Sequence, residues 1–86
     1  MNLNFEVDAG LQIEVTALGK PSDDLVILLH GGGQTRHAWG ATTKKLAESG
    51  FYTLAIDLRG HGDSDWSPNG DYAIENFRDD LISIIK

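Results

Sequence analysis

The sequence of 86 residues predicts an α/β fold, in which an N-terminal β-hairpin is followed by a β-α-β-α unit with parallel strands. Three observations indicate this class. Apolar and polar residues alternate near the N-terminus, which is typical of strands with one buried face. Of two later apolar runs, the first is continuously apolar, which is typical of parallel strands, and the second also has the pattern of a buried strand. A helical pattern follows each run, so we expect a right-handed crossover between neighbouring parallel strands.

The first two strands are predicted over residues 3–7 and 11–18. Each strand has its apolar residues on one face, and the residues between them, Asp8-Ala9-Gly10, are typical of a turn. The apolar positions are Leu3, Phe5 and Val7 in the first strand, and Leu11, Ile13 and Val15 in the second. This pattern predicts a hairpin.

The third and fourth strands are predicted at residues 25–29 and 51–58. The first of these runs, Leu-Val-Ile-Leu-Leu, has no polar position, which predicts a strand buried on both faces. A helix is predicted between the two strands, from about residue 36 to residue 49, with Gly50 as its C-terminal cap. Its inward stripe is expected to contain Trp39, Thr42 or Thr43, and Leu46.

The last part of the sequence predicts a long loop over residues 59–71 and an amphipathic helix over residues 72–86. The helix has Ile74, Phe77, Leu81 and Ile85 in register along one face. A helix in this place should lead to a fifth strand, and the sequence stops at Lys86 without one. We therefore expect residues 1–86 to be a single N-terminal portion of a larger domain, truncated before its next strand.

Composition and charge exclude several classes of function. The net charge is −6 and the seven Lys and Arg residues are scattered, which argues against a nucleic-acid partner. Cysteine is absent, so the chain has no disulfide, thiolate nucleophile or Cys-based zinc site. The first ten residues do not have the pattern of a signal peptide, and residues 25–29 are too few to cross a bilayer. We expect a cytoplasmic protein with no membrane partner.

Three glycines follow the third predicted strand, in the sequence His30-Gly31-Gly32-Gly33. Glycine costs conformational entropy, so such a run needs a reason: a bound phosphate, a bound oxyanion or a tight turn. A dinucleotide site would use Gly31 and Gly33, with Asp57 after the next strand as the ribose-binding acid. Against it, Arg36 occupies the third glycine position of that fingerprint, and two strands precede the glycines.

A second motif makes the oxyanion interpretation specific. The run Asp-Leu-Arg-Gly-His-Gly-Asp-Ser occupies residues 57–64, after the fourth predicted strand. Together with the glycines at residues 31–33 it resembles the N-terminal part of an α/β-hydrolase. The resemblance is to the branch that holds epoxide hydrolases, dehalogenases, cofactor-free haloperoxidases and carbon–carbon bond hydrolases. It implies an incomplete α/β-hydrolase sheet with strand order 1-2-4-3, truncated before the strand that carries the nucleophile.

The resemblance also implies roles for individual residues. The backbone amides of Gly32 and Gly33 would form part of an oxyanion hole, and Trp39 would line the pocket. Supporting roles fall to His30, Gly31, Asp57, Arg59, Gly60, Gly62 and Ser64. The substrate would be a small ester-like or related molecule, with no cofactor and no metal. The nucleophile, acid and catalytic histidine would come later in the chain, so we expect these residues to be inactive alone.

The sequence departs from the family pattern at two places. Gly32 and Gly33 replace a bulky residue and a proline that commonly follow His-Gly, which leaves the pocket floor and the substrate open. Ala73 stands where a Ser or Thr cap often begins the next helix.

Three other patterns are better explained by structural roles. His61, Asp63 and Ser64 are the three residue types of a catalytic triad, but they are too close in sequence to adopt its geometry, and no G-x-S-x-G elbow is present. Residues 65–70 resemble half of an EF-hand loop, without the acid at its twelfth position. The histidines, His30 among them, do not have metal-ligand spacing.

The resemblance finally predicts an exposed sheet edge. In the strand order 1-2-4-3, residues 25–29 form the edge, with no charge or proline to blunt it. We expect this edge to pair with a second copy of the chain or with a complementary C-terminal fragment, so that the chain is not a stable monomer.

Overall fold

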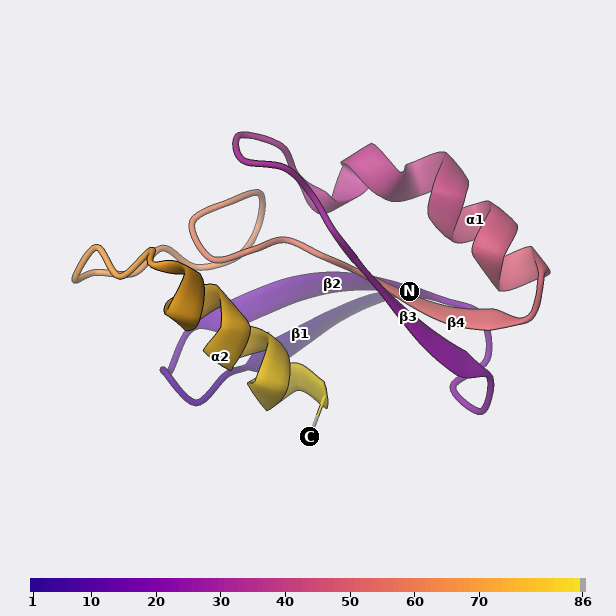
Figure 1. Ribbon diagram of the computed structural model, residues 1–86, viewed down its shortest axis with the longest axis horizontal. Helices are drawn as coiled ribbons and strands as arrows, with labels where there is room; N and C mark the ends of the chain where they lie inside the picture. The colour runs from indigo at the N-terminus through magenta and orange to yellow at the C-terminus, as the bar shows by residue number, and fades with distance from the viewer. Residues whose placement is uncertain (86) are drawn as a thin grey trace.

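The computed structural model describes residues 1–85 and contains one mixed sheet of four strands (Figure 1). The elements in chain order are β1 (Asn2–Glu6), β2 (Gln12–Leu18), β3 (Asp24–Leu29), the 3-10 helix η1 (Arg36–Trp39), α1 (Gly40–Glu48), β4 (Phe51–Ile56) and α2 (Ile74–Ile85). The strand order is β1-β2-β4-β3. The predicted α/β class, element order and strand order are therefore confirmed.

The predicted hairpin is formed by β1 and β2. They pair antiparallel with Leu3 opposite Val15 and Phe5 opposite Ile13, so the alternating apolar residues share one face. Gly10 closes the turn at a φ of 85°, a conformation that side chains other than glycine rarely adopt. The other face of β2 is more polar, because Glu14 and Thr16 alternate with the buried positions.

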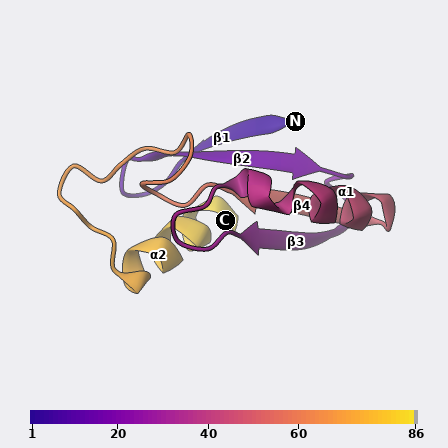
Figure 2. The same ribbon diagram turned by 90° about the horizontal axis from the view of Figure 1, so that it is seen from above.

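The two apolar runs form the parallel pair. β3 pairs with β4 in parallel, and β4 pairs antiparallel with β2. α1 connects β3 to β4, and the two helices lie on opposite sides of the sheet (Figures 1 and 2). Because β3 and β4 are parallel, their carboxyl ends meet at the same edge, and the loops that follow them are neighbours.

The main core lies between the sheet and α2. Its buried members are Val7, Leu11, Ile13, Val15, Ala17, Leu54, Ile56 and Ile84. The other face of the sheet is covered by α1 and is more polar. There Thr53 donates to the carbonyl of Leu18 at 3.2 Å, and Thr43 donates to the carbonyl of Gly40 at 2.9 Å. These bonds satisfy hydroxyl groups that would otherwise be costly to bury.

The prediction that β3 is buried on both faces is wrong, because residues 26–28 are only half-buried and the two ends of the run are exposed. Leu25 is 48% exposed and Leu29 is 39% exposed, because β3 is an edge strand of the described sheet. The continuous apolar pattern correctly predicted parallel pairing, but it contains no information about whether a strand has one neighbour or two.

The bounds of both predicted helices, and the inward face of the second, differ from the prediction. The first begins as the 3-10 turn η1 before it becomes α1, and Gly50 follows its end at a φ of 94°, as a cap should. The second begins at Ile74 rather than residue 72. Its inward face contains Phe77, Leu81 and Ile84, as well as Asp80, whereas the predicted members Ile74 and Ile85 are 77% and 55% exposed. Within residues 1–85, no helix is both long and apolar enough to cross a membrane.

Candidate functional site

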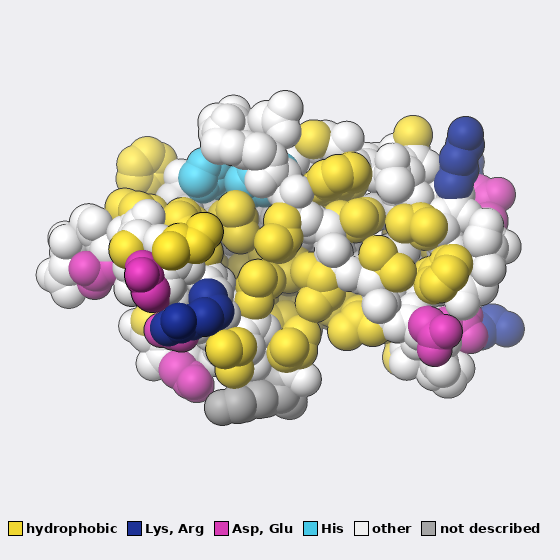
Figure 3. Space-filling view, viewed as in Figure 1, with side chains coloured by type: hydrophobic (Ala, Val, Ile, Leu, Met, Phe, Trp, Pro, Cys, Tyr) yellow, Lys and Arg dark blue, Asp and Glu magenta, His cyan; other side chains and the backbone are white. Residues whose placement is uncertain are grey.

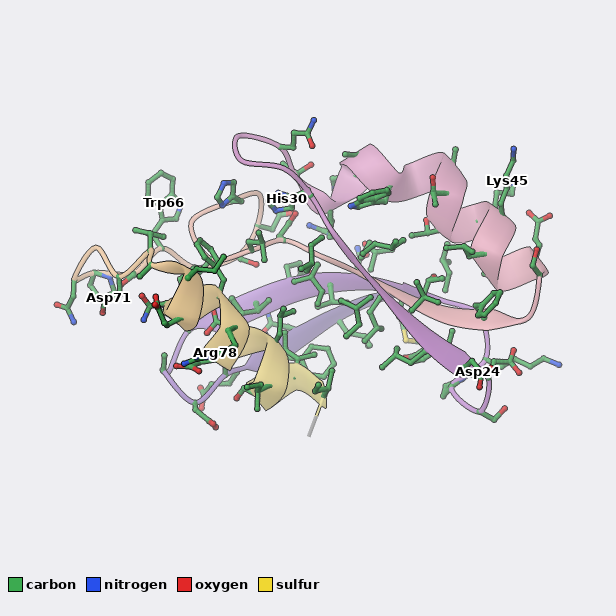
Figure 4. All side chains as sticks on the ribbon, in the orientation of Figure 1. Asp24, His30, Lys45, Trp66, Asp71 and Arg78 are labelled. Carbon is green, nitrogen blue, oxygen red and sulfur yellow. The ribbon has the colours of Figure 1, made fainter. Side chains whose placement is uncertain are left out.

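Two loops meet at the carboxyl ends of β3 and β4. We call residues 31–35 the glycine loop and residues 57–65 the β4 loop. His30 lies where β3 enters the glycine loop (Figure 4). In open α/β sheets, ligands bind at the carboxyl ends of the strands.

The glycine loop contains a tight turn. The amide of Gln34 donates to the carbonyl of Gly31 at 3.1 Å, and Gly33 has a φ of 79° while Gly32 has no positive φ. This combination defines a type II turn, in which the third residue is usually glycine. The Gln34 side chain closes the loop further, because its Oε1 accepts from the amide of Gly31 at 3.0 Å.

The turn leaves two backbone donors unused. Within residues 1–85, neither the Gly32 amide nor the Gly33 amide donates to a protein acceptor. Both residues are exposed, and a Cβ atom on either would meet nothing within 4 Å. The turn therefore presents free N–H groups in an accessible place, which is what an anion or oxyanion site requires. Their catalytic role stays a prediction.

His30 connects the two loops as a buried, neutral imidazole. It is 5% exposed, and its Nε2 accepts from the amide of Leu58 at 3.0 Å. Since Nε2 is the acceptor, Nδ1 carries the proton and donates to the carbonyl of Gly31 at 2.8 Å. The His61 ring lies against it, with centroids 4.8 Å apart. His30 therefore lies beneath the glycines, hydrogen-bonded to both loops, and its supporting role stays a prediction.

Asp57 is fully buried at the end of β4 and is an acceptor for three donors. Its carboxylate accepts from the Arg36 amide at 2.5 Å, from the Asp63 amide at 3.0 Å and from the Arg36 guanidinium. Burial acts to raise the pKa of Asp57, but the hydrogen bonds from Asp63 and Arg36 and the Arg36 charge together hold it below its ordinary value. Asp57 is therefore a structural anion.

Arg36 is the partner that the sequence analysis did not identify. It is 4% exposed, and besides Asp57 its guanidinium contacts Asp63 at 3.1 Å and Thr16 Oγ1 at 2.8 Å. Burial acts to lower the pKa of Arg36, and the bonds to Asp63 and Asp57 raise it above its ordinary value. The signal available in the sequence was that Arg36 lies one helical turn before Trp39, the first residue of the predicted inward stripe, and so on the same face. The ion pair also argues against a dinucleotide site, which needs the acid free for a ribose.

The β4 loop is fixed by Ser64 and its neighbours. Ser64 Oγ donates to the carbonyl of Asp57 at 2.6 Å and accepts from the amide of Glu14 at 2.8 Å. Asp65 accepts from the amide of Gln12 at 2.8 Å, so the EF-hand-like run begins with a carboxylate that is already engaged. Ser64 is 4% exposed and its single proton is used, which agrees with a structural role.

Arg59 attaches the β4 loop to α2. Its Nε and Nη2 donate to the two carboxylate oxygens of Asp80 at 2.7 and 2.6 Å, and its Nη1 donates to the carbonyl of Asp71 at 3.0 Å. The bond to Asp80 raises the pKa of Arg59 above its ordinary value, against the effect of burial. The sequence signal for Asp80 was a charged residue within an apolar stripe, which indicates a buried charge but does not identify its partner. Gly60 lets Tyr72 approach, because a Cβ there would lie 2.6 Å from the ring.

An apolar groove of about 420 Å³ separates the glycine loop from α2. Its lining is Leu29, His30, Gly32, Leu58, His61, Ile74, Phe77, Arg78 and Leu81. Figure 3 shows hydrophobic side chains gathered across this side of the molecule. Gly32 is thus the one glycine of the loop in the groove lining, and Trp39 is not part of that lining. The indole Nε1 of Trp39 is buried without a partner among the described residues, and its pocket role stays a prediction.

Comparison with known proteins identifies the family. The family model for the alpha/beta hydrolase fold matches residues 24–85, which include both loops and α2. The chain belongs to the α/β-hydrolase fold family. It covers the N-terminal portion of that fold, as the two motifs predicted.

Relatives of this α/β-hydrolase chain include hydrolases of different kinds. It is 36% identical over 78 residues to an AB hydrolase superfamily protein of Bacillus subtilis, covering 88% of this chain and 27% of the relative. It is 39% identical over 61 residues to an esterase of Mycobacterium tuberculosis, covering 71% and 20%. It is 35% identical over 81 residues to epoxide hydrolase 3 of Xenopus tropicalis, covering 92% and 22%. The chain therefore spans between a fifth and about a quarter of these relatives.

Solved α/β-hydrolase structures superimpose on nearly the whole chain. An epoxide hydrolase from Vigna radiata gives a TM-score of 0.90 at 27% identity, covering 99% of this chain and 27% of that one. A thioesterase domain from the curacin biosynthetic pathway gives a TM-score of 0.90 at 28% identity, covering 99% of this chain and 32% of that one.

Within residues 1–85, no group of three or more His, Asp or Glu side chains is arranged to hold a metal ion.

Proposed function

We propose that this chain supplies the oxyanion loop of a hydrolase that acts on small ester-like or related substrates. The observation that carries the proposal is the pair of unused amides at Gly32 and Gly33, at the end of a parallel strand and beside an apolar groove. The esterase and epoxide hydrolases among its relatives support the same class of chemistry.

The loop would act by stabilising charge. As a nucleophile attacks a carbonyl carbon, the carbonyl oxygen becomes negative, and fixed N–H groups lower the energy of that state. Removing one such donor typically reduces kcat by about 100-fold to 1,000-fold. The hydrogen bonds between Gly31 and Gln34 order the turn that carries Gly32 and Gly33 before substrate arrives. The groove lining, which is largely aliphatic and aromatic, favours a substrate with an apolar group next to its reacting carbon.

The described residues do not provide the rest of the machinery. Ser64 donates its proton to a backbone carbonyl, and Nε2 of His30 is occupied by Leu58. We therefore propose that the nucleophile, the acid and the catalytic histidine come from polypeptide outside residues 1–86, and that these residues alone are inactive.

The test uses a hybrid, in which the chain is continued by the remainder of the related esterase from Mycobacterium tuberculosis. Gly32→Pro removes the amide proton at a turn position that accepts proline, whereas Gly32→Ala keeps the proton and adds a methyl group in open space. We expect kcat on a chromogenic ester to fall by about 100-fold or more for Gly32→Pro relative to Gly32→Ala. Equal rates in the two variants would contradict the proposal.

The isolated chain provides the complementary test. We expect no turnover of the chromogenic ester above the buffer rate. Turnover that is lost in Ser64→Ala or His61→Ala would show that the chain has its own catalytic group and would overturn the proposed division of the machinery.

A second candidate function is assembly. It is favoured by the edge position of β3, whose side chains at residues 25–29 are all apolar. We propose that this edge pairs with a second copy of the chain when no complementary C-terminal fragment is present.

A further inference from the structure

Two side chains flank the glycine loop, and both bind the same short segment at the end of β4. His30 precedes the loop and accepts from the amide of Leu58, while Arg36 follows it and binds the carboxylate of Asp57. The loop is therefore attached at both ends to consecutive residues of one strand end.

Between these attachments the loop has little support of its own. The hydrogen bonds of Gln34 to Gly31 close the turn internally, and residues 31–34 are exposed. Among residues 1–85, no hydrogen bond of the Gly32 or Gly33 backbone ties either residue to the sheet. The position of their amides relative to β4 must therefore follow from where the two ends are held.

Arg36 holds its end through four hydrogen bonds in different directions. Its backbone amide and its guanidinium both bind the Asp57 carboxylate, and the guanidinium also contacts Asp63 in the β4 loop. Its Nε donates to Thr16 on β2 at 2.8 Å. The backbone bond does not depend on the side chain, but the guanidinium makes the other three contacts at once, which a lysine ammonium on a flexible stem cannot reproduce.

We propose that Arg36 is a positioning residue for the oxyanion site. By fixing the start of η1 on Asp57, it holds the Gly32 and Gly33 amides at the place where the substrate oxygen becomes negative. The inference rests on the proposed function, since it assigns no contact between Arg36 and substrate. It predicts an effect on kcat rather than on substrate binding, because misplacement of a catalytic group by about 1 Å can cost about 100-fold in rate.

The test measures kcat and KM of the same esterase hybrid. Arg36→Lys keeps the charge and loses the fork, and we expect kcat to fall by about 10-fold to 100-fold with KM changed less than about 3-fold. Lys45→Ala removes a positive charge from the exposed side of α1 and should leave both constants unchanged (Figure 4). An Arg36→Lys hybrid with unchanged kcat would overturn the proposal.

A second readout does not depend on activity. In the NMR spectrum of the labelled 86-residue chain, Arg36→Lys should shift the amide signals of Gly32 and Gly33. Arg59→Lys disturbs the other buried ion pair, which does not contact the glycine loop, and should leave these two signals in place. If the two variants lower the melting temperature by similar amounts but only Arg36→Lys shifts the Gly32 and Gly33 signals, the positioning role is supported. Equal shifts of these signals in both variants would contradict it.

Failure of the proposed function and failure of the positioning role of Arg36 give different results. If Gly32→Pro and Gly32→Ala hybrids have the same kcat, the proposed function fails whatever Arg36 does. If they differ and Arg36→Lys has no effect on kcat, only the positioning role fails.

A second variant applies if Arg36→Lys does not fold. Thr16→Val removes the hydroxyl that accepts from Arg36 Nε and leaves the Arg36–Asp57 ion pair intact. It should then lower kcat by about 2-fold to 10-fold, and no change would overturn the proposal.

Discussion

A Cβ atom on Gly62 would overlap the carboxylate of Asp57. The carboxylate cannot move aside, because it accepts hydrogen bonds from Asp63 and from both the backbone and the side chain of Arg36. Gly62 also has a φ of 50°, which disfavours other residues. The glycine is therefore required by the ion pair beneath it, and its loss should disturb the whole junction between the two loops.

We expect Gly62→Ala to destabilise the chain much more than a matched substitution at Gly70. Gly70 has a φ of 71°, and a Cβ there would meet nothing within 4 Å. Gly70→Ala should cost about 1–2 kcal/mol from the left-handed conformation alone. Gly62→Ala should add a further cost of about 1–3 kcal/mol from overlap with Asp57. Urea unfolding at one protein concentration measures the difference, and equal losses would show that Asp57 moves freely.

Acid should weaken the same junction through Asp57. The folded chain holds the pKa of Asp57 below its ordinary value of 3.8, so the unfolded chain binds a proton more readily. The stabilisation is therefore complete above about pH 4 and is lost as the pH falls through the lower pKa of the folded state. We expect the free energy of unfolding to decrease below about pH 4.

The Asp57→Asn variant isolates this contribution. It should be less stable than the parent at neutral pH, and it should lose less stability on acidification because the group that titrates is gone. Unfolding in urea at several pH values compares the two slopes. Parallel slopes would exclude Asp57 as a source of the acid sensitivity.

The Arg59–Asp80 pair should be essential for attaching α2. Both side chains are more than nine-tenths buried, and breaking such a pair leaves an uncompensated charge at a cost of about 3–5 kcal/mol. Asp80→Leu should therefore be strongly destabilising, and Arg59→Met in the same chain should recover much of the loss. Arg78 and Asp79 form an exposed pair on the same helix, so Asp79→Leu should cost less than about 1 kcal/mol. Comparable losses in Asp80→Leu and Asp79→Leu would contradict the prediction.

The sequence was informative wherever the local pattern decides the structure. Alternation decided the hairpin, because one face of β2 is buried along its length and the matching face of β1 is half-buried. The apolar runs decided the parallel pair, and the two motifs identified the family and with it the strand order. Gly50 was predicted as a cap because its positive φ follows from the end of one helix.

The remaining features depend on contacts between distant residues. Arg36 and Asp57 are 21 residues apart, and so are Arg59 and Asp80, so no local pattern shows that these charges neutralise each other inside the protein. The pair formed by Asp80 also explains the rotated face of α2. The hydrophobic pattern predicted Phe77 and Leu81 correctly but added Ile74 and Ile85, whereas the observed inward face has Asp80 and Ile84 in their place.

The last prediction concerns the open edge of β3. Its outward N–H and C=O groups have no partner strand within residues 1–85, and Leu25 and Leu29 are exposed beside them. Long apolar edges of this kind pair readily with another chain, and a twofold axis would let β3 of two copies pair with each other. The net charge of −6 opposes this contact, so added salt should strengthen it by screening.

We expect sedimentation at low micromolar concentration to show a dimer or larger assembly that dissociates in Leu25→Lys. Lysine on an edge strand repels a second copy and keeps the exposed position hydrated. Ala41→Lys adds the same charge to an exposed position on α1 and should leave the assembly intact. A cooperatively folded monomer whose size is the same in the parent and in Leu25→Lys would show that the β3 edge does not pair. Dissociation by both substitutions would instead show that the effect is not specific to the edge and would exclude the edge as the specific contact.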